Sequence, residues 1–103
     1  MKVSLIILIM FLQLKAYTAT CFDESKKELY NIKVQNKCLY FTDGQWKNTC
    51  MGRYSYKTKT GEYVYSNGDT DFYISKFIHG KFSLTANDVE YGSSTDNCVL
   101  NNK

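Results

Sequence analysis

The chain of 103 residues contains no proline, one histidine and no Asn-x-Ser/Thr sequon. The absence of proline excludes proline-rich linkers and collagen-like segments. One histidine cannot supply a zinc site built on several imidazoles, and the four cysteines include no Cys-x-x-Cys pair. We therefore expect neither a metal ion nor a cofactor. The charged fraction is an ordinary 22% and the aromatic fraction a high 16%, which argues against intrinsic disorder.

The N-terminal residues have the pattern of a secretory signal peptide. A basic start precedes a largely apolar run over residues 3–12, too short to anchor a chain in a bilayer, and small residues follow it. Cleavage after Ala19 divides the chain into a signal peptide, residues 1–19, and a secreted domain, residues 20–103. Cleavage after Ala16 is the alternative. We expect no membrane association after removal of the signal.

The charge balance of the secreted domain is nearly even. Removal of residues 1–19 takes away two lysines and leaves 11 basic against 10 acidic residues, a net charge of about +1. A near-neutral domain gives no global electrostatic reason to expect nucleic-acid binding. Residues 20–59 nevertheless hold eight basic and four acidic side chains, whereas residues 60–103 hold three and six. If this asymmetry survives folding, one face of the domain is basic.

Four cysteines follow the predicted signal: Cys21, Cys38, Cys50 and Cys98. A secreted domain of this size buries only ~60–65% of its unfolded surface, and such domains commonly add disulfides. Three pairings are possible. We favour Cys21–Cys98, which ties the ends of the domain, together with Cys38–Cys50. The chain-entropy model gives ~4 and ~3 kcal/mol for these two bonds.

The segment 28–41 carries two competing patterns. Tyr30, Val34 and Cys38 fall on one helical face, whereas Tyr30, Ile32 and Val34 also alternate as in a strand. The length of the segment and its lack of glycine favour a helix. Strand is the alternative.

The second half of the domain reads as strands joined by turns. Tyrosines alternate with other residues over 54–66, and Asn67-Gly68 is the strongest hairpin signal, because both residues tolerate the φ > 0 of a type I′ turn. The polar segment 92–97 is predicted to be a loop. We predict an α+β fold in which one helix packs on a four- to five-stranded antiparallel sheet tied by disulfides. An all-β sandwich is the alternative.

Residues of the first predicted hairpin form a candidate binding surface. Tyrosines can stack on bases or sugars while neighbouring lysines meet phosphates, although cross-strand aromatic packing is the commoner role of such residues. The candidate residues are Tyr54, Tyr56, Lys57, Lys59, Tyr63 and Tyr65. No phosphate loop or nucleophile motif is present, and we predict no catalytic residue.

The order of early cysteine, helix, strand meander and late cysteine resembles that of small secreted fungal ribonucleases. It looks more closely like the ribonuclease-like effectors of powdery mildews. The segments 67–74 (NGDTDFYI) and 92–98 (GSSTDNC) are similar in layout to the last strands of these ribonucleases.

The family resemblance also implies which catalytic groups to look for. Such ribonucleases use a glutamate base, a phosphate-binding arginine and a histidine acid. Glu62 lies near the base position, Phe72 stands where the arginine is expected, and the stretch 83–88 has no histidine. His79 comes earlier in the chain. Because one general acid–base group contributes ~10²–10⁴-fold to the rate, the resemblance implies a protein without ribonuclease activity.

We therefore predict a secreted, non-catalytic, ribonuclease-like virulence effector of a plant-pathogenic fungus. The predicted partners of this monomer are a host protein or RNA, and the resemblance implies entry into the host cell and recognition by a host immune receptor. One alternative is an active secreted ribonuclease that uses Glu62, Arg53 and His79. Another is a β-sandwich effector of the MAX type.

Overall fold

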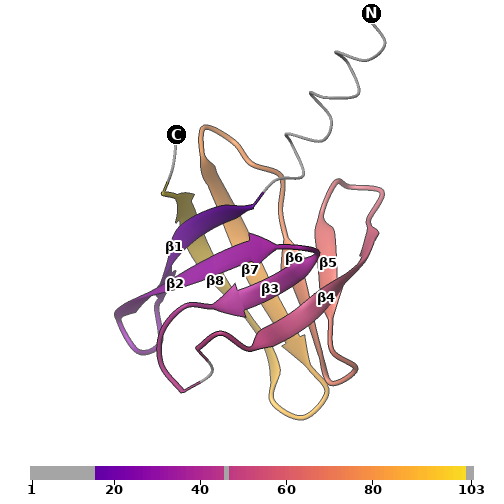
Figure 1. The fold of residues 1–103 in the computed structure, drawn as a ribbon, viewed down its shortest axis with the longest axis horizontal. Coiled ribbons are helices and arrows are strands. Elements are labelled where there is room, and N and C mark those ends of the chain that lie inside the picture. The colour runs from indigo at the N-terminus through magenta and orange to yellow at the C-terminus, as the bar shows by residue number, and fades with distance from the viewer. Residues whose placement is uncertain (1–15, 46, 102–103) are drawn as a thin grey trace, which may run out of the picture.

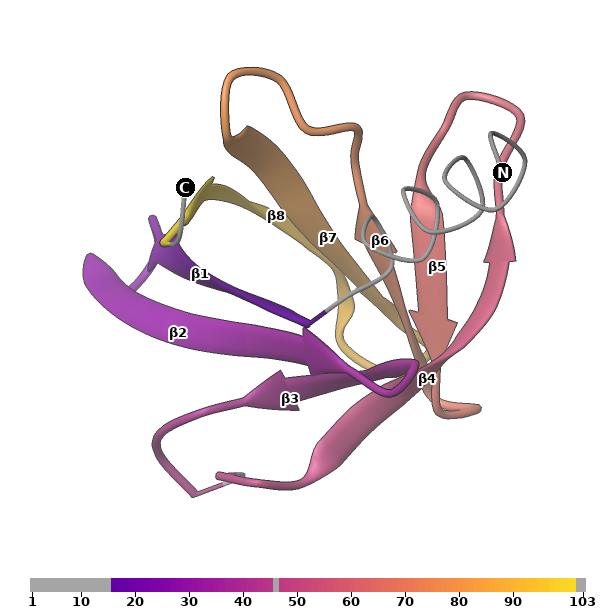
Figure 2. The ribbon, with the colours of Figure 1, turned by 45° about the horizontal axis from the view of Figure 1, so that its top comes forward.

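The computed structural model describes residues 16–45 and 47–101 as eight antiparallel strands that close into one barrel (Figures 1 and 2). Each strand pairs with the next, and the last pairs with the first. The strands are β1 (Tyr17–Asp23), β2 (Glu28–Gln35), β3 (Cys38–Phe41), β4 (Cys50–Lys57), β5 (Tyr63–Ser66), β6 (Thr70–Ile74), β7 (Lys81–Asp88) and β8 (Gly92–Leu100). The described part of the chain has no helix long and apolar enough to cross a membrane.

The predicted helix is absent, and the α+β prediction is wrong. Residues 28–41 form the β2–β3 hairpin instead, with Gln35 paired to Cys38 across a two-residue turn. Both turn residues, Asn36 and Lys37, have φ near +60°, which no right-handed helix can contain but which a type I′ hairpin turn requires. The strand alternation in this segment was therefore the correct signal.

The number of strands also exceeds the predicted four to five. The all-β alternative is correct in class, but the single sheet closes on itself instead of splitting into the two layers of a sandwich. The polar segment 92–97, predicted to be a loop, belongs to β8, which pairs with β7 from Gly92 to Val99. Its polarity fits a strand with one face toward solvent.

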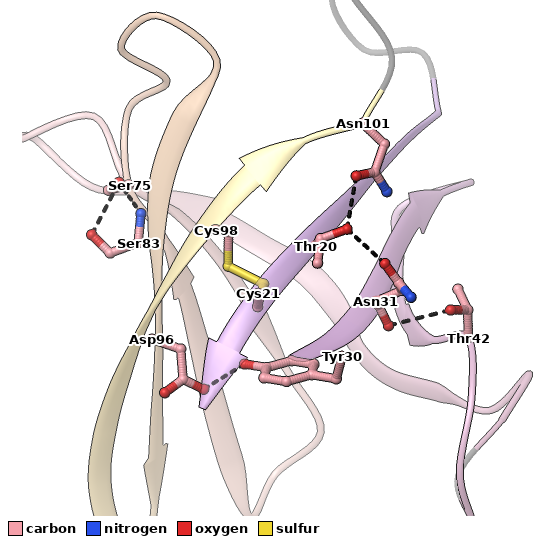
Figure 3. The surroundings of a disulfide bond; sticks show 10 residues. All are labelled: Thr20, Cys21, Tyr30, Asn31, Thr42, Ser75, Ser83, Asp96, Cys98 and Asn101. Carbon is pink, nitrogen blue, oxygen red and sulfur yellow. Dashed lines mark hydrogen bonds between the residues drawn. A yellow bond between two sulfur atoms is a disulfide. The ribbon is translucent and has the colours of Figure 1, made fainter. Parts of the chain in front are cut away.

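Closure joins β1 to β8 at the position of a disulfide. Cys21 and Cys98 are direct register partners, with their Cα atoms 4.0 Å apart, and both are buried (Figure 3). The second disulfide links Cys38 to Cys50 at the β3–β4 pair. The prediction of two disulfides is confirmed, and the pairs are those favoured from the sequence. A disulfide-bonded chain is compatible with an extracellular protein.

The core of the barrel is formed by apolar side chains and by the Cys21–Cys98 bond. All strands contribute to it, β4 only through the partly buried Met51. Alternate residues of each strand point inward, as the period of two in a strand requires. The best-buried members of this core are Ala19, Cys21, Ile32, Leu39, Ile74 and Cys98.

The connections between strands divide the barrel into two ends, as a meander requires (Figures 1 and 2). The hairpin end carries the β1–β2, β3–β4, β5–β6 and β7–β8 connections. The terminal end carries the β2–β3, β4–β5 and β6–β7 connections, together with the start of β1 and the end of β8.

The predicted signal peptide lies mostly outside the described residues, which begin at Ala16. β1 starts at Tyr17, and Ala19 is fully buried opposite Leu100. Cleavage after Ala16 leaves β1 whole, whereas cleavage after Ala19 removes its first three residues.

Candidate ligand-binding site

A pocket of about 710 Å³ lies at the hairpin end of the barrel. Its walls come from β1, β2, β3, β6, β7 and β8 and from the β1–β2 and β3–β4 connections. The volume is within the 300–1,000 Å³ of typical small-molecule sites. Eight-stranded barrels of this kind are just wide enough either to fill with side chains or to hold one small ligand.

The base of the pocket is aromatic and aliphatic. Tyr30, Phe41 and Phe72 meet edge to face, with ring centroids 5.9 Å apart for the first pair and 6.4 Å for the second. Leu84 and Ala86 of β7 complete this surface. These residues face one another because the register pairs Phe72 with Ala86 and places Leu84 next along the inward face of β7.

The rim of the pocket is acidic. Asp23, Glu28, Asp43 and Asp96 line it against a single lysine, Lys26. The Asp23 carboxylate accepts hydrogen bonds from the Ser25 hydroxyl at 2.7 Å and from two backbone N–H groups of the β1–β2 turn. These bonds, that of the Ser25 hydroxyl first, lower the pKa of Asp23 and keep it ionised. The site therefore presents negative charge above an apolar base.

One polar pair bridges the rim and the base (Figure 3). The Tyr30 hydroxyl of β2 donates to Oδ2 of Asp96 in β8 at 2.5 Å, and both side chains are partly buried. Burial first, and then this hydrogen bond, raise the pKa of Tyr30, so the phenol stays protonated and remains a donor. Asp96 faces inward because the register places it opposite the buried Leu84. Its second oxygen has no hydrogen bond within the described part of the chain.

The tyrosines predicted as a binding surface are split between two faces of the sheet. Tyr54 lies 6.2 Å from Tyr63 and 5.7 Å from Tyr65 between ring centroids, and Tyr65 is buried in the core. Tyr56 instead neighbours the hydroxyl of Tyr73, whose pKa it raises. The cause is a register shift between Tyr54 and Tyr56, which breaks the alternation that the sequence suggested.

The two lysines of the predicted surface lie at the terminal end, away from the pocket. Lys57 ends β4, and its Nζ sits 5.2 Å from the centroid of the Tyr63 ring. Lys59 is exposed in the β4–β5 connection. The six predicted residues therefore form no single face, and none of them lines the pocket.

The residues of the ribonuclease alternative do not assemble into a site. Arg53 is exposed in β4, Glu62 accepts hydrogen bonds from Thr58 and Thr60 in the β4–β5 connection, and His79 is exposed in the β6–β7 turn. In the described part of the chain no hydrogen bond joins these three residues. The described residues also contain no cluster of three metal-ligating side chains.

Sequence reasoning missed the pocket residues, although faint signals were present. The alternation of Ser94, Asp96 and Cys98 is that of a strand that turns one side inward. Acidic residues also recur beside each hairpin turn of the hairpin end. The pairing of Asp96 with Tyr30, 66 positions away, has no local signal.

Comparison of the chain with protein-family models, with curated proteins and with solved structures finds no match. The likeness to ribonuclease-like effectors therefore stays a prediction.

Proposed function

We propose that this protein acts by binding rather than by turnover, and that its ligand is a small organic cation with an apolar body. The observation that carries this proposal is the pocket at the hairpin end, in which the Tyr30–Asp96 pair joins an aromatic base to an acidic rim. The role of secreted effector, with a host protein or RNA as partner, stays a prediction beside it.

The chemistry of the pocket selects the charge of the ligand. Four carboxylates and one ammonium group line it, so an anionic ligand is repelled and a cation is attracted. Aromatic rings add to this preference, because the negative face of each ring attracts a cation by ~0.5–2 kcal/mol. The second oxygen of Asp96 is placed to accept a hydrogen bond from an ammonium group.

The apolar base selects the rest of the ligand. A body of one or two rings can cover Phe41, Phe72 and Leu84 while its amine reaches Asp96. A ligand of this size binds with roughly 0.3 kcal/mol per non-hydrogen atom. This gives a Kd of tens of micromolar for about twenty atoms and of a few millimolar for about twelve atoms. The expected affinity is therefore modest.

Calorimetric titration with a matched pair of probes tests the proposal. Tryptamine carries an ammonium group on an indole ring, and indole-3-acetate carries a carboxylate on the same ring. We expect tryptamine to bind and indole-3-acetate to bind at least tenfold more weakly, because the rim is acidic. Equal affinity for the two probes, or binding of neither, would refute the proposal.

Two variants locate the site of binding. Asp96→Asn keeps an acceptor for the Tyr30 hydroxyl but removes the charge, and we expect it to weaken tryptamine binding about tenfold. Asp69→Asn is the matched control, since Asp69 is an exposed acid of the same end that does not line the pocket. Equal losses in the two variants would show general charge attraction and no specific site.

A further inference from the structure

The two ends of the barrel carry opposite charge. Nine of the ten acidic residues lie at or near the hairpin end, in the segments 23–28, 69–71 and 88–90 and at positions 43 and 96. Lysines at positions 26, 27 and 47 are the basic residues among them. Although the net charge of the domain is close to zero, the hairpin end of the barrel is therefore acidic.

The terminal end is basic. Lys37 lies in the β2–β3 turn, Lys57 and Lys59 in or beside the β4–β5 connection, and Lys76 and Lys81 at the two ends of the β6–β7 connection. The β4–β5 and β6–β7 connections touch, because the aliphatic stem of Lys76 lies where a side chain on Gly61 would stand. Lysines of both connections are therefore brought to one region of the surface.

An apolar tip stands among these lysines. Ile78 is 63% exposed at the apex of the β6–β7 connection, and the neighbouring Phe77 is 41% exposed. Ile78 and Lys81 exchange two backbone hydrogen bonds, of 2.8 and 3.0 Å, across a turn in which His79 and Gly80 both have φ > 0. The exposed isoleucine is thus held on a tight turn and cannot fold back into the core.

The base of this tip is anchored in the barrel. The Phe77 ring lies 5.2 Å from that of Tyr17 and 4.9 Å from that of Phe82, measured between centroids. The Gly80 carbonyl accepts a hydrogen bond of 2.8 Å from the backbone N–H of Leu100 in β8. The tip is therefore a fixed part of the barrel surface, which holds Ile78 toward solvent among the lysines of the terminal end.

We propose that the terminal end docks on an anionic lipid surface, with Ile78 entering the headgroup region and the surrounding lysines meeting the negative headgroups. Apolar side chains ringed by lysine are the pattern of peripheral membrane binding, in which the lysine stems lie along the interface. The opposite charges of the two ends also favour this orientation, because an anionic surface attracts the terminal end and repels the hairpin end. The docked barrel then holds its pocket open toward the water.

Lipid is favoured over nucleic acid by the character of the tip. Single-stranded RNA is bound by the flat faces of exposed aromatic rings. The ring of Phe77 is instead packed against Tyr17 and Phe82, and Ile78, the more exposed of the two apolar residues of the tip, is aliphatic. Contact of this kind needs no membrane-spanning segment, and it departs from the sequence-based expectation of no membrane association.

Co-sedimentation with vesicles tests the docking. The secreted, disulfide-bonded protein is mixed with vesicles of phosphatidylcholine alone or with roughly 30% phosphatidylserine. We expect binding to the anionic vesicles, little binding to the neutral ones, and loss of binding at high salt. Ile78→Asp should reduce the partition coefficient about tenfold, since it replaces the inserted side chain by a repelled one. Val89→Asp, at an apolar residue of the hairpin end that is even more exposed than Ile78, should leave the partition coefficient unchanged.

Charge reversal supplies a second matched pair. Lys76→Glu combined with Lys81→Glu should reduce binding at least tenfold. Lys27→Glu combined with Lys47→Glu, at exposed lysines of the opposite end that do not line the pocket, should not. Unfolding midpoints of all variants check that the fold is retained.

Three results would overturn the proposal. The first is equal binding to neutral and anionic vesicles, and the second is equal loss in the test variants and their controls. The third is absence of binding to the anionic vesicles. Binding to polyuridine, or salt-sensitive dimers in sedimentation velocity, would then assign the basic end to RNA or to a second copy of this chain.

Discussion

Tyrosine carries several roles in this molecule, and the environment of each residue separates them. Tyr65 is 7% exposed in the core, Tyr30 donates to a carboxylate in the pocket, and Tyr56 and Tyr73 meet on the outer face. Burial raises the pKa of Tyr65 to about 12 and also raises the pKa of Tyr17 and Tyr30. These phenols are therefore held neutral by folding.

The raised pKa values of the buried tyrosines predict that the protein is less stable at alkaline pH. Below the unfolded value of 10.0, Tyr65 is neutral in both states and stability does not depend on it. Above that pH the tyrosine ionises first in the unfolded chain, so Tyr65 alone lowers the free energy of unfolding by about 1.4 kcal/mol per pH unit until its folded pKa near 12 is reached. Tyr17 and Tyr30 lower it in the same direction. Urea unfolding measured across this range should show the decline, and Tyr65→Phe should make it shallower. An identical pH dependence in the variant would contradict the assignment.

Gly52 shows how closely two strands approach inside the barrel. A Cβ atom at Gly52 would lie 3.0 Å from the backbone carbonyl carbon of Tyr65 and 3.1 Å from the backbone nitrogen of Ser66. A residue with a side chain would have to push β4 and β5 apart. Glycine is therefore required here by packing, since its φ is not in the left-handed region.

At the scale of single elements, the turns decide the architecture. The turn after β5 does not have the predicted type I′ form with Asn67-Gly68 at its centre. Asn67 instead hydrogen-bonds to Thr70 across Gly68 and Asp69, and of these two Gly68 alone has positive φ. The Asn67 side chain accepts from the N–H groups of Asp69 and Thr70, which fixes the turn one residue later.

The β2–β3 turn gives a prediction at this scale. Lys37 has φ +64°, a conformation that is unfavourable by ~1–2 kcal/mol for a residue with a side chain. Lys37→Gly should therefore raise the free energy of unfolding by ~0.5–1 kcal/mol, after the greater entropy of glycine in the unfolded chain is subtracted. Lys33→Gly, within β2, should lower it by ~0.5–1 kcal/mol. Chemical denaturation checks both, and destabilisation by Lys37→Gly would show that the turn is not strained.

At the scale of the whole molecule, closure of the sheet dominates. β1 and β8 would be exposed edges in an open sheet, and their pairing removes both. The Cys21–Cys98 bond lies on this seam and encloses 77 positions of the chain, whereas Cys38–Cys50 encloses 12. The first bond therefore restricts the unfolded chain more strongly.

Removal of each disulfide should reflect this difference. Replacement of Cys21 and Cys98 by alanine should lower the free energy of unfolding by ~4 kcal/mol, and replacement of Cys38 and Cys50 by ~3 kcal/mol. The seam variant should also weaken tryptamine binding, because Tyr30 and Asp96 face each other across β1. Calorimetry and denaturation of the two double variants measure these effects. The reverse order of stabilities would argue against the seam as the main constraint.

The sequence by itself determined the local features of this protein. Strand alternation, turn residues and cysteine positions predict the hairpins of the second half and the two disulfides, because each depends on neighbouring residues or on the few cysteines available. The same reasoning chose a helix for residues 28–41, because an amphipathic helix and an alternating strand share residues such as Tyr30 and Val34.

Only the tertiary structure decided how these elements meet. Closure brings Asp96 to Tyr30, a register shift separates Tyr56 from Tyr54, and the meander sorts charges that are mixed along the chain into two opposite ends. The sequence predicts a difference in charge between residues 20–59 and residues 60–103. In the barrel the difference lies instead between the hairpin end, which is acidic, and the terminal end, which is basic. The physical reason is that register and closure depend on contacts between residues distant in sequence, and no local pattern encodes those contacts.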